Sequence, residues 1–244
     1  MMYPFFDPQY WLIVGPTVLL AMWATWRVRS VFARYSDVGV RSGMSGAEAA
    51  AAVARAAGLE VGVARQGGDA EKGVVNIQRF EGFLTDHYDP STKTLNLSPD
   101  VYDGRSVSSI AVAAHECGHA IQDARGYAWL GFRTKMVPIT KIGSNLWIWV
   151  FLAGMFMHQR YLANLGIALF GAVVLFQLVT LPVEFDASNR AKAVLASSGI
   201  VSTQEEAQGV SRVLGAAAMT YVAGALTAIA TLVYYILLAN RRRD

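Results

Sequence analysis

The chain has 244 residues, and 54% of them are Ala, Val, Ile, Leu, Met, Phe, Trp, Tyr or Cys before its 22 glycines are counted, whereas an ordinary soluble domain reaches ~45–50% with glycine included. Charged residues make up only 16%, against an ordinary ~25%, which excludes intrinsic disorder, a charged coiled coil and a nucleic-acid-binding arm, so we expect no nucleic-acid partner. The net charge of +3 is small, and the single cysteine, Cys117, excludes an intramolecular disulfide and a multi-cysteine zinc site.

Four stretches of the chain contain no Asp, Glu, Lys or Arg and are long enough, or nearly so, to cross a bilayer, which takes ~20 apolar residues. In chain order they are residues 8–26, 142–159, 161–183 and 213–240. The second and third are so close together that they predict a tight helical hairpin. The sequence therefore predicts an integral membrane protein with four transmembrane helices and the lipid bilayer as a partner.

The segment between the first two stretches, residues 27–141, is predicted to form a small unit of mixed α and β structure. Ser45 can cap a helix that runs through Ala57 and ends at Gly58. Residues 59–64 alternate like a short strand, and the Gly-rich residues 67–73 predict a flexible loop.

A β-hairpin is predicted from the next two extended runs. Residues 83–88 and 94–98 are rich in strand formers, and the turn sequence at 89–93 joins them. Because this hairpin comes shortly before the helix with the metal-binding motif, we expect one of its strands to border a substrate cleft and to hold an extended peptide by main-chain hydrogen bonds.

The next predicted helix begins at Ser106 or Ser108 and carries a His-Glu-x-x-His motif at residues 115–119. At about 100° per residue, His115 and His119 project from one face a turn apart, so both imidazoles can bind one metal ion. Glu116 lies one step round the helix, where it can take a proton from a water on that metal. The motif predicts one Zn²⁺ per chain and hydrolysis with Glu116 as the catalytic base. The alternative is a pair of surface histidines.

A catalytic zinc site also has a third protein ligand and an open position for water. We expect this ligand just after the third apolar stretch, because two membrane crossings return the chain to the side of His115. Glu184 is the preferred candidate and Asp186 the rival, since residues two apart on a helix point in nearly opposite directions. The alternative is that both carboxylates pair with Arg190 or Lys192.

Three further side chains are candidates for contacts with the substrate. His87 is either a polar group facing the zinc or a hairpin histidine bonded to Asp86 or Asp89. Tyr88 and Tyr102 either polarise the scissile carbonyl or pack against the zinc helix. Cys117 points away from His115 and is expected to be a small buried side chain.

Several motifs together resemble the YugP-like membrane zinc metallopeptidases of bacteria. They are Ser45-Gly-Ala-Glu48, Leu84-Thr-Asp-His-Tyr-Asp-Pro90, Leu95-Asn-Leu-Ser98, Val101-Tyr102, Ala113-Ala-His-Glu-Cys-Gly-His-Ala-Ile-Gln122 and Pro182-Val-Glu-Phe-Asp-Ala-Ser188. That family is similar to the heat-shock membrane protease and the CAAX prenyl protease, in which a Glu-x-x-Ala-Asp element supplies the third zinc ligand. The resemblance implies a gluzincin with Glu184 as this ligand. Ser188 stands where those relatives have aspartate, and we expect it to donate a hydrogen bond to a neighbouring group. Residues 64–80 are longer than the corresponding segment expected for that family, and we interpret them as a local insertion.

We therefore predict a mainly α protein, a four-helix integral membrane zinc endopeptidase with a small α+β zincin-like catalytic unit and peptides or membrane proteins as substrates. The predicted organisation is a transmembrane helix (1–26), the catalytic region (27–141), a transmembrane hairpin (142–183), the third-ligand helix and loop (184–212), and a last transmembrane helix with a basic tail (213–244). Two alternatives are a non-catalytic zinc-binding membrane adaptor and a transporter or channel. A structural zinc site has no use for Glu116, and the apolar stretches lack the charges that transport requires.

The distribution of basic residues predicts the orientation in a bacterial inner or plasma membrane. Residues on the catalytic side of a four-span arrangement include Arg27, Arg29, Arg34, Arg133, Lys135, Lys141, Arg190, Lys192 and Arg212, against Arg160 and Arg241 to Arg243 on the other side. The positive-inside rule therefore places the catalytic side in the cytoplasm. Residues Arg241 to Arg243 conflict with this orientation, and a last segment that only re-enters the membrane would resolve the conflict.

Overall fold

The computed structural model describes residues 7–63, 74–82 and 85–241, and these residues are mainly helical. The chain divides into two compact units. The first, here called the helical unit, contains residues 1–26, 131–182 and 219–244, and the second, here called the mixed unit, contains residues 27–130 and 183–218. The loop predicted at residues 67–73, much of the insertion inferred at 64–80 and the first two residues of the predicted hairpin lie outside the described residues.

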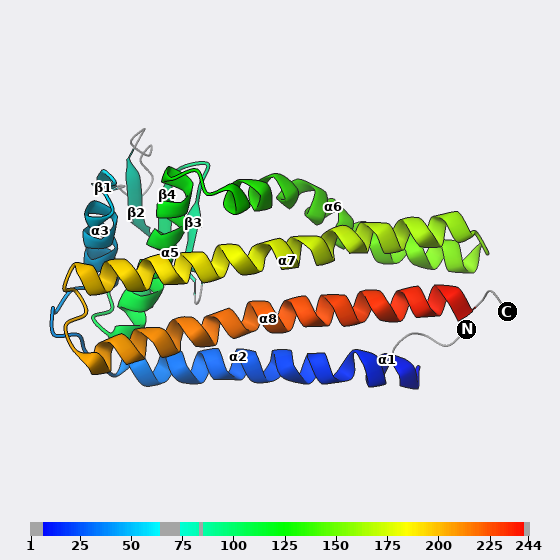
Figure 1. The fold of residues 1–244 in the computed structure, drawn as a ribbon, viewed down its shortest axis with the longest axis horizontal. Helices are drawn as coiled ribbons and strands as arrows, with labels where there is room; N and C mark the ends of the chain where they lie inside the picture. The colour runs from blue at the N-terminus through cyan, green and yellow to red at the C-terminus, as the bar shows by residue number, and fades with distance from the viewer. Residues whose placement is uncertain (1–6, 64–73, 83–84, 242–244) are drawn as a thin grey trace. The chain divides into compact units, whose positions relative to one another are not determined.

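Five helices contribute to the helical unit: α1 (Pro8–Ile13), α2 (Gly15–Ser36), α6 (Ala128–Phe156), α7 (Arg160–Ser197) and α8 (Gln204–Arg241) (Figure 1). Within the described residues, three of them, α6, α7 and α8, are long and apolar enough to cross a membrane. They contain most of the second predicted apolar stretch and all of the third and fourth, which supports the association of this chain with a membrane. The helices α6 and α8 begin well before these stretches, and their first turns include polar residues.

The first apolar stretch, residues 8–26, falls on α1 and α2. The six residues of α1 are too few to cross a bilayer, and the second half of α2 carries Arg27 and Arg29. This stretch nevertheless packs within the helical unit, where Val14 is fully buried and the Thr227 hydroxyl of α8 donates to the carbonyl of Thr17. A fourth membrane crossing remains a prediction.

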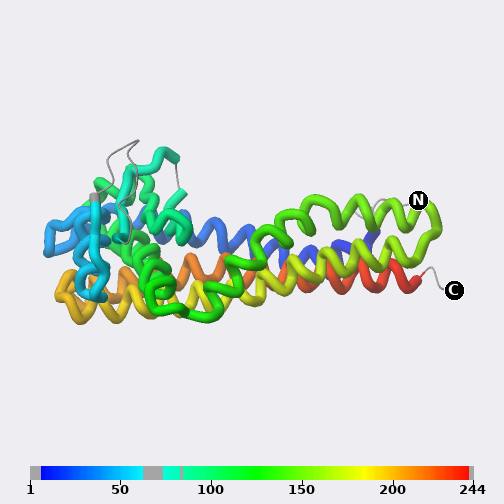
Figure 2. The backbone as a smooth tube through the Cα atoms, turned by 90° about the horizontal axis from the view of Figure 1, so that it is seen from above, coloured from blue at the N-terminus to red at the C-terminus, as the bar shows by residue number. Residues whose placement is uncertain are grey.

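The predicted helical hairpin is formed by α6 and α7, which lie side by side up to the short turn between them (Figure 1, Figure 2). Glycines permit this close approach. A Cβ at Gly154 of α6 would come within 2.2 Å of the backbone nitrogen of Ala163, and one at Gly166 of α7 within 2.6 Å of that of Phe151. The helix α6 also contains Pro138, which cannot donate the usual helical hydrogen bond.

The mixed unit holds a four-stranded sheet with the order β1-β2-β4-β3. Its strands are β1 (Val61–Val63), β2 (Val75–Arg79), β3 (His87–Asp89) and β4 (Thr94–Leu97). The strand β2 pairs in parallel with both β1 and β4, whereas β3 pairs antiparallel with β4 and forms an edge of the sheet. The predicted hairpin is therefore confirmed as β3 and β4. The central strand β2 was not predicted, because its five residues carry too short a pattern.

Three helices complete this part of the mixed unit: α3 (Gly46–Ala56) and α5 (Val107–Ala124), both labelled in Figure 1, and the short α4 (Pro99–Tyr102). Ser45 caps α3 through a capping box with Glu48, as the sequence predicts, and Ser106 rather than Ser108 caps α5. The Ala-rich helix α3 packs against α5, and the buried side chains of Leu95 and Leu97 join the same core. This packing makes α5 a buried helix inside the unit.

Candidate metal centre

The two histidines of the motif lie on the buried helix α5, as the sequence predicts. The His115 and His119 rings meet edge to face, with centroids 4.9 Å apart. Their one-turn spacing places both Nε2 atoms on the side of α5 that faces α7. The helix therefore presents two nitrogen ligands toward one point.

A carboxylate from α7 completes this group. The Glu184 Oε2 atom lies 3.2 Å from His115 Nε2 and 3.6 Å from His119 Nε2. Among the described residues, His115, His119 and Glu184 form a group that could hold a metal ion, with ligand atoms all within 4.8 Å of one another. Two imidazole nitrogens and one carboxylate oxygen are a donor set that catalytic zinc sites use.

The burial of this group also fits a bound cation. Glu184 is only 2% exposed, and a buried carboxylate is costly unless positive charge or hydrogen bonds compensate it. Burial opposes the protonation of His119, but the hydrogen bond with Glu184 and the charge of Glu116 outweigh it and raise the pKa of His119. The residues present therefore suit a divalent cation.

Each histidine is also held at its other ring nitrogen. The Ser188 hydroxyl lies 3.1 Å from His115 Nδ1, and the Gln122 Oε1 atom lies 3.0 Å from His119 Nδ1. Because Gln122 Oε1 can only accept, His119 must carry its proton on Nδ1, which leaves Nε2 free for a metal ion. With His115 Nε2 directed at Glu184, the proton on Nδ1 would donate to the Ser188 hydroxyl, so Ser188 would accept this hydrogen bond rather than donate one as expected.

Gln122 belongs to a longer hydrogen-bonded chain that the sequence reasoning missed. Its side chain is fully buried, and Nε2 donates to the Val183 carbonyl (2.8 Å) and to Asp186 Oδ2 (2.7 Å). Asp186 in turn pairs with Arg190 at 2.5 Å. Asp186 therefore contacts Gln122 and Arg190 instead of the imidazoles. Its ion pair with Arg190 is the alternative role considered for this carboxylate. The signal in the sequence was the glutamine one turn after His119.

Glu116 is buried and lies next to the edge strand β3. Its Oε2 atom accepts a hydrogen bond of 3.0 Å from the backbone N–H of Tyr88. This N–H points away from β4, because it is bonded to α5 and β3 forms the edge of the sheet. The hairpin strand thus lies beside the motif, and its outward donor at Tyr88 already holds the Glu116 carboxylate.

The Tyr88 side chain fastens β3 to α5 at a second point. Its hydroxyl donates to Asp123 Oδ2 at 2.7 Å, and Lys93 from the hairpin turn pairs with the same carboxylate. Burial and the hydrogen bond to Asp123 raise the pKa of Tyr88 well above its usual value, so the phenol stays a donor. Tyr88 therefore packs against the motif helix and does not point its hydroxyl at the metal group.

The other candidate side chains lie elsewhere. His87 contacts the Thr85 carbonyl through Nδ1 (2.7 Å) and Asn96 through Nε2 (3.1 Å), so the expected partners Asp86 and Asp89 are wrong. Both carboxylates have other partners, since Asp86 accepts from Ser98 and Asp89 accepts from Ser91.

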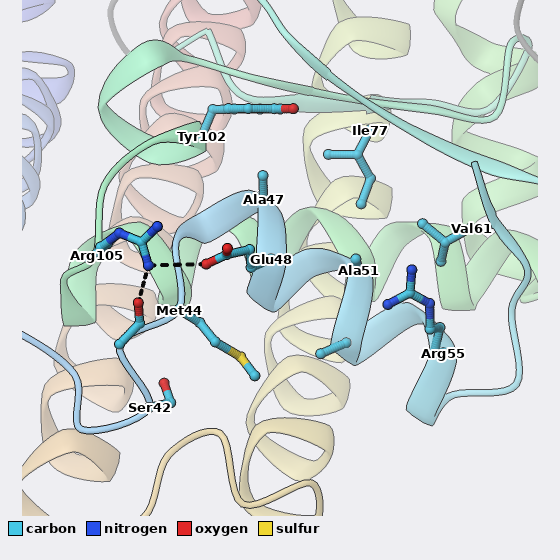
Figure 3. A pocket seen from close by; sticks show the side chains of 12 residues that line it. Ser42, Met44, Ala47, Glu48, Ala51, Arg55, Val61, Ile77, Tyr102 and Arg105 are labelled. Carbon is cyan, nitrogen blue, oxygen red and sulfur yellow. Dashed lines mark hydrogen bonds and ion pairs between the residues drawn. The ribbon is translucent and has the colours of Figure 1, made fainter. Parts of the chain in front are cut away.

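Tyr102 lines a separate cavity of about 690 Å³ beside α3 (Figure 3). In this view the Arg105 guanidinium bridges Glu48 and the Gly43 carbonyl at one end of the cavity, and Arg55 lies at the other. The lining residues include none of the metal group.

Two small residues allow α5 and α7 to approach each other. A Cβ at Gly118 would come within 2.4 Å of the Ala187 carbonyl oxygen. On the opposite side of α5, Cys117 is fully buried and its thiol donates to the Ala50 carbonyl of α3. Burial raises the pKa of the Cys117 thiol, which keeps it protonated, so Cys117 is the small buried side chain that was expected.

Comparisons with known proteins agree with this geometry. Residues 10–240 match the model of a family described as "Putative neutral zinc metallopeptidase". The chain is also 42% identical over 225 residues to a protein of Bacillus subtilis (strain 168) named "Putative membrane protease YugP", with 92% of this chain and 94% of the relative covered. No solved structure matches the chain.

Proposed function

The chain belongs to the neutral zinc metallopeptidase family, with zinc as its cofactor, and on that premise we propose that it is a membrane-embedded zinc endopeptidase that cleaves membrane or membrane-proximal proteins. One observation carries the proposal. Glu116 lies directly beside a buried group of His115, His119 and Glu184, in the same helix as the two histidines. A merely structural zinc site, as in a non-catalytic membrane adaptor, needs no buried carboxylate there.

In this proposal each residue has a separate role. His115, His119 and Glu184 hold the zinc, which supplies a Lewis acid and a water whose pKa is lowered to ~7. Glu116 takes the proton from the attacking water and passes it to the leaving amine. The Tyr88 N–H keeps the Glu116 carboxylate in place for both transfers.

The edge strand β3 is the proposed template for the substrate. An extended peptide can add to an exposed strand edge through main-chain hydrogen bonds, which tolerate many sequences. Because the Tyr88 N–H is bonded to Glu116, the substrate would use the outward Tyr88 carbonyl instead. Substrate N–H groups would then donate to β3 while the scissile carbonyl faces the zinc.

The catalytic side is proposed to face the cytoplasm of a bacterial cell. The excess of Arg and Lys in the segments on the His115 side of a four-span arrangement supports this orientation. A reporter fusion after Lys93 should give a cytoplasmic signal, and an external signal would reverse the assignment.

Metal removal and return test the proposed activity. The purified full-length protein, reconstituted in vesicles, should cleave an unstructured protein substrate, stop after treatment with a chelator, and recover when about one equivalent of zinc is added. A protein that binds one zinc but cleaves nothing under any condition would support the adaptor instead.

A further inference from the structure

A second, smaller cavity lies within the helical unit, where α6 ends, α7 begins and α8 ends. Its volume is about 150 Å³, and its polar lining consists of His158, Arg160, Asn164 and Asn240, with small and apolar residues between them. A water molecule occupies ~30 Å³ of liquid, so this space exceeds what a single water needs. It is large enough for a compact polar group of several atoms.

The histidine in this lining has an unusual backbone. His158 follows α6 with a φ of 56°, and the next residue, Gln159, donates its N–H back to the Gly154 carbonyl at 2.8 Å. This is the conformation in which helices commonly end with glycine, because a Cβ is disfavoured there. Histidine at this position places an imidazole at the cavity at a cost in backbone energy.

The charge of the lining favours an anion. His158, Arg160, Asn164 and Asn240 all offer N–H donors, and no carboxylate belongs to the lining. Among the described residues, neither His158 nor Arg160 has an acidic partner. An anion with several oxygen acceptors would satisfy these donors, and a guanidinium suits phosphate in particular.

The carboxylate of Asp7 contacts the last part of α8 outside this lining. Asp7 accepts a hydrogen bond from the Tyr234 hydroxyl at 3.1 Å and lies 3.8 Å from Arg241. Its partners are Tyr234 and Arg241, and neither of them lines the cavity.

The surface around the turn is apolar and aromatic. Phe156 is 73% exposed, Met157 61% and Tyr161 89%, although they flank the basic lining in sequence. Such a combination of exposed apolar side chains and adjacent basic donors is typical of the boundary between the hydrocarbon and the headgroups of a bilayer. A ligand that meets both kinds of surface must itself be amphiphilic.

We propose that this cavity binds the phosphodiester headgroup of an anionic glycerophospholipid. The phosphate oxygens would accept hydrogen bonds from Arg160 and His158, and headgroup hydroxyls would bond to Asn164 and Asn240. The cavity is too small for acyl chains, which would lie outside it along the apolar helices. A role in lipid binding also gives a reason for basic residues at this end of α8, where the positive-inside rule alone does not expect them.

Lipid titrations of the delipidated full-length protein in a nonionic detergent test this site. Native mass spectrometry would count bound phosphatidylglycerol and, in parallel, phosphatidylcholine of the same chain length. Three variants are compared with the wild type: Arg160→Gln, His158→Gly and Lys135→Gln. Lys135→Gln is the matched control, because it removes one positive charge from α6 away from the cavity. Glycine accepts the φ of residue 158 without strain, so His158→Gly should fold at least as stably as the wild type.

We expect one saturable phosphatidylglycerol per chain and much weaker binding of phosphatidylcholine. Arg160→Gln and His158→Gly should each weaken phosphatidylglycerol binding about fivefold or more, whereas Lys135→Gln should not. His158→Gly should do so without lowering the unfolding temperature. Equal binding by all variants, or equal binding of the two lipids, would overturn the proposal. Displacement of the lipid by millimolar inorganic phosphate would assign the site to free phosphate instead.

Discussion

Gly118 of α5 lies so close to Ala187 of α7 that a Cβ on the glycine would come within 2.4 Å of the Ala187 carbonyl oxygen. His119 adjoins Gly118 in the chain, and Glu184 precedes Ala187 by almost one helical turn. The distance between the imidazoles and the carboxylate therefore depends on how closely these two helices approach. Gly118 and Ala187 are small enough to permit this close approach.

Replacing Gly118 by alanine should push the two helices apart. We expect Gly118→Ala to cost ~1–3 kcal/mol in the free energy of unfolding, as overpacking of a core does, and to reduce zinc affinity. Thermal unfolding and zinc content by mass spectrometry would measure both effects. Gly215→Ala is the matched control, because nothing lies within 4 Å of its Cβ and alanine favours a helix by ~1 kcal/mol. Wild-type zinc affinity in Gly118→Ala would show that the contact does not set the site.

The two carboxylates of α7 should differ in their effect on the metal. Glu184→Ala removes an oxygen that lies beside both imidazoles, so we expect almost complete loss of zinc. Asp186→Ala removes only a partner of Gln122 and Arg190, so zinc should be retained with modestly reduced affinity. Competition with a chromogenic chelator would give both affinities. The reverse order would mean that the assignment of the third ligand is wrong.

Gln122 should matter for zinc although it does not contact the metal. Gln122→Ala frees the His119 ring to rotate and to exchange its proton, and loss of such a support typically costs ~10–100-fold in metal affinity. Ser188→Ala should act on His115 in the same direction. Gln78→Ala, which loses a side-chain hydrogen bond within the sheet, is a control of the same residue type. If Gln122→Ala binds zinc as Gln78→Ala does, the hydrogen bond does not tune the ligand.

The candidate metal-binding residues were more predictable from the sequence than the residues that hydrogen-bond to them. The motif at 115–119, the cap at Ser45 and the β3–β4 hairpin follow from local rules of spacing, capping and turns. Gln122 acquires its role only when α7 brings Val183 and Asp186 beside α5, a contact between distant parts of the chain that no local pattern encodes.

The sheet and the long helices show the same limit. The strand β2 is recognisable only from its parallel partners on both sides, since Val75–Arg79 is short and partly polar. The early start of α6 could not be placed from hydropathy either, because a membrane helix may continue through polar residues without a change in its backbone pattern. Hydropathy locates an apolar stretch, and the ends of the helix follow from other contacts.

The proposed use of β3 as a substrate template can be tested without altering the protein. Ester-for-amide substitution in a cleaved peptide removes one N–H donor at a time, and a hydrogen bond contributes ~0.5–1.5 kcal/mol. We expect kcat/KM to fall about threefold to tenfold at the position that pairs with the Tyr88 carbonyl and to change little at solvent-facing positions. A uniform response along the peptide would exclude strand pairing with β3.

The most direct test of the central claim measures zinc content and peptide cleavage in the same preparation of Glu116→Gln. Since Glu116 lies outside the group of His115, His119 and Glu184, the variant should keep about one zinc per chain. It should nevertheless lose cleavage by at least ~10²–10⁴-fold, because glutamine cannot accept the proton of the attacking water. A Glu116→Gln protein that binds zinc and still cleaves at the wild-type rate would contradict the mechanism.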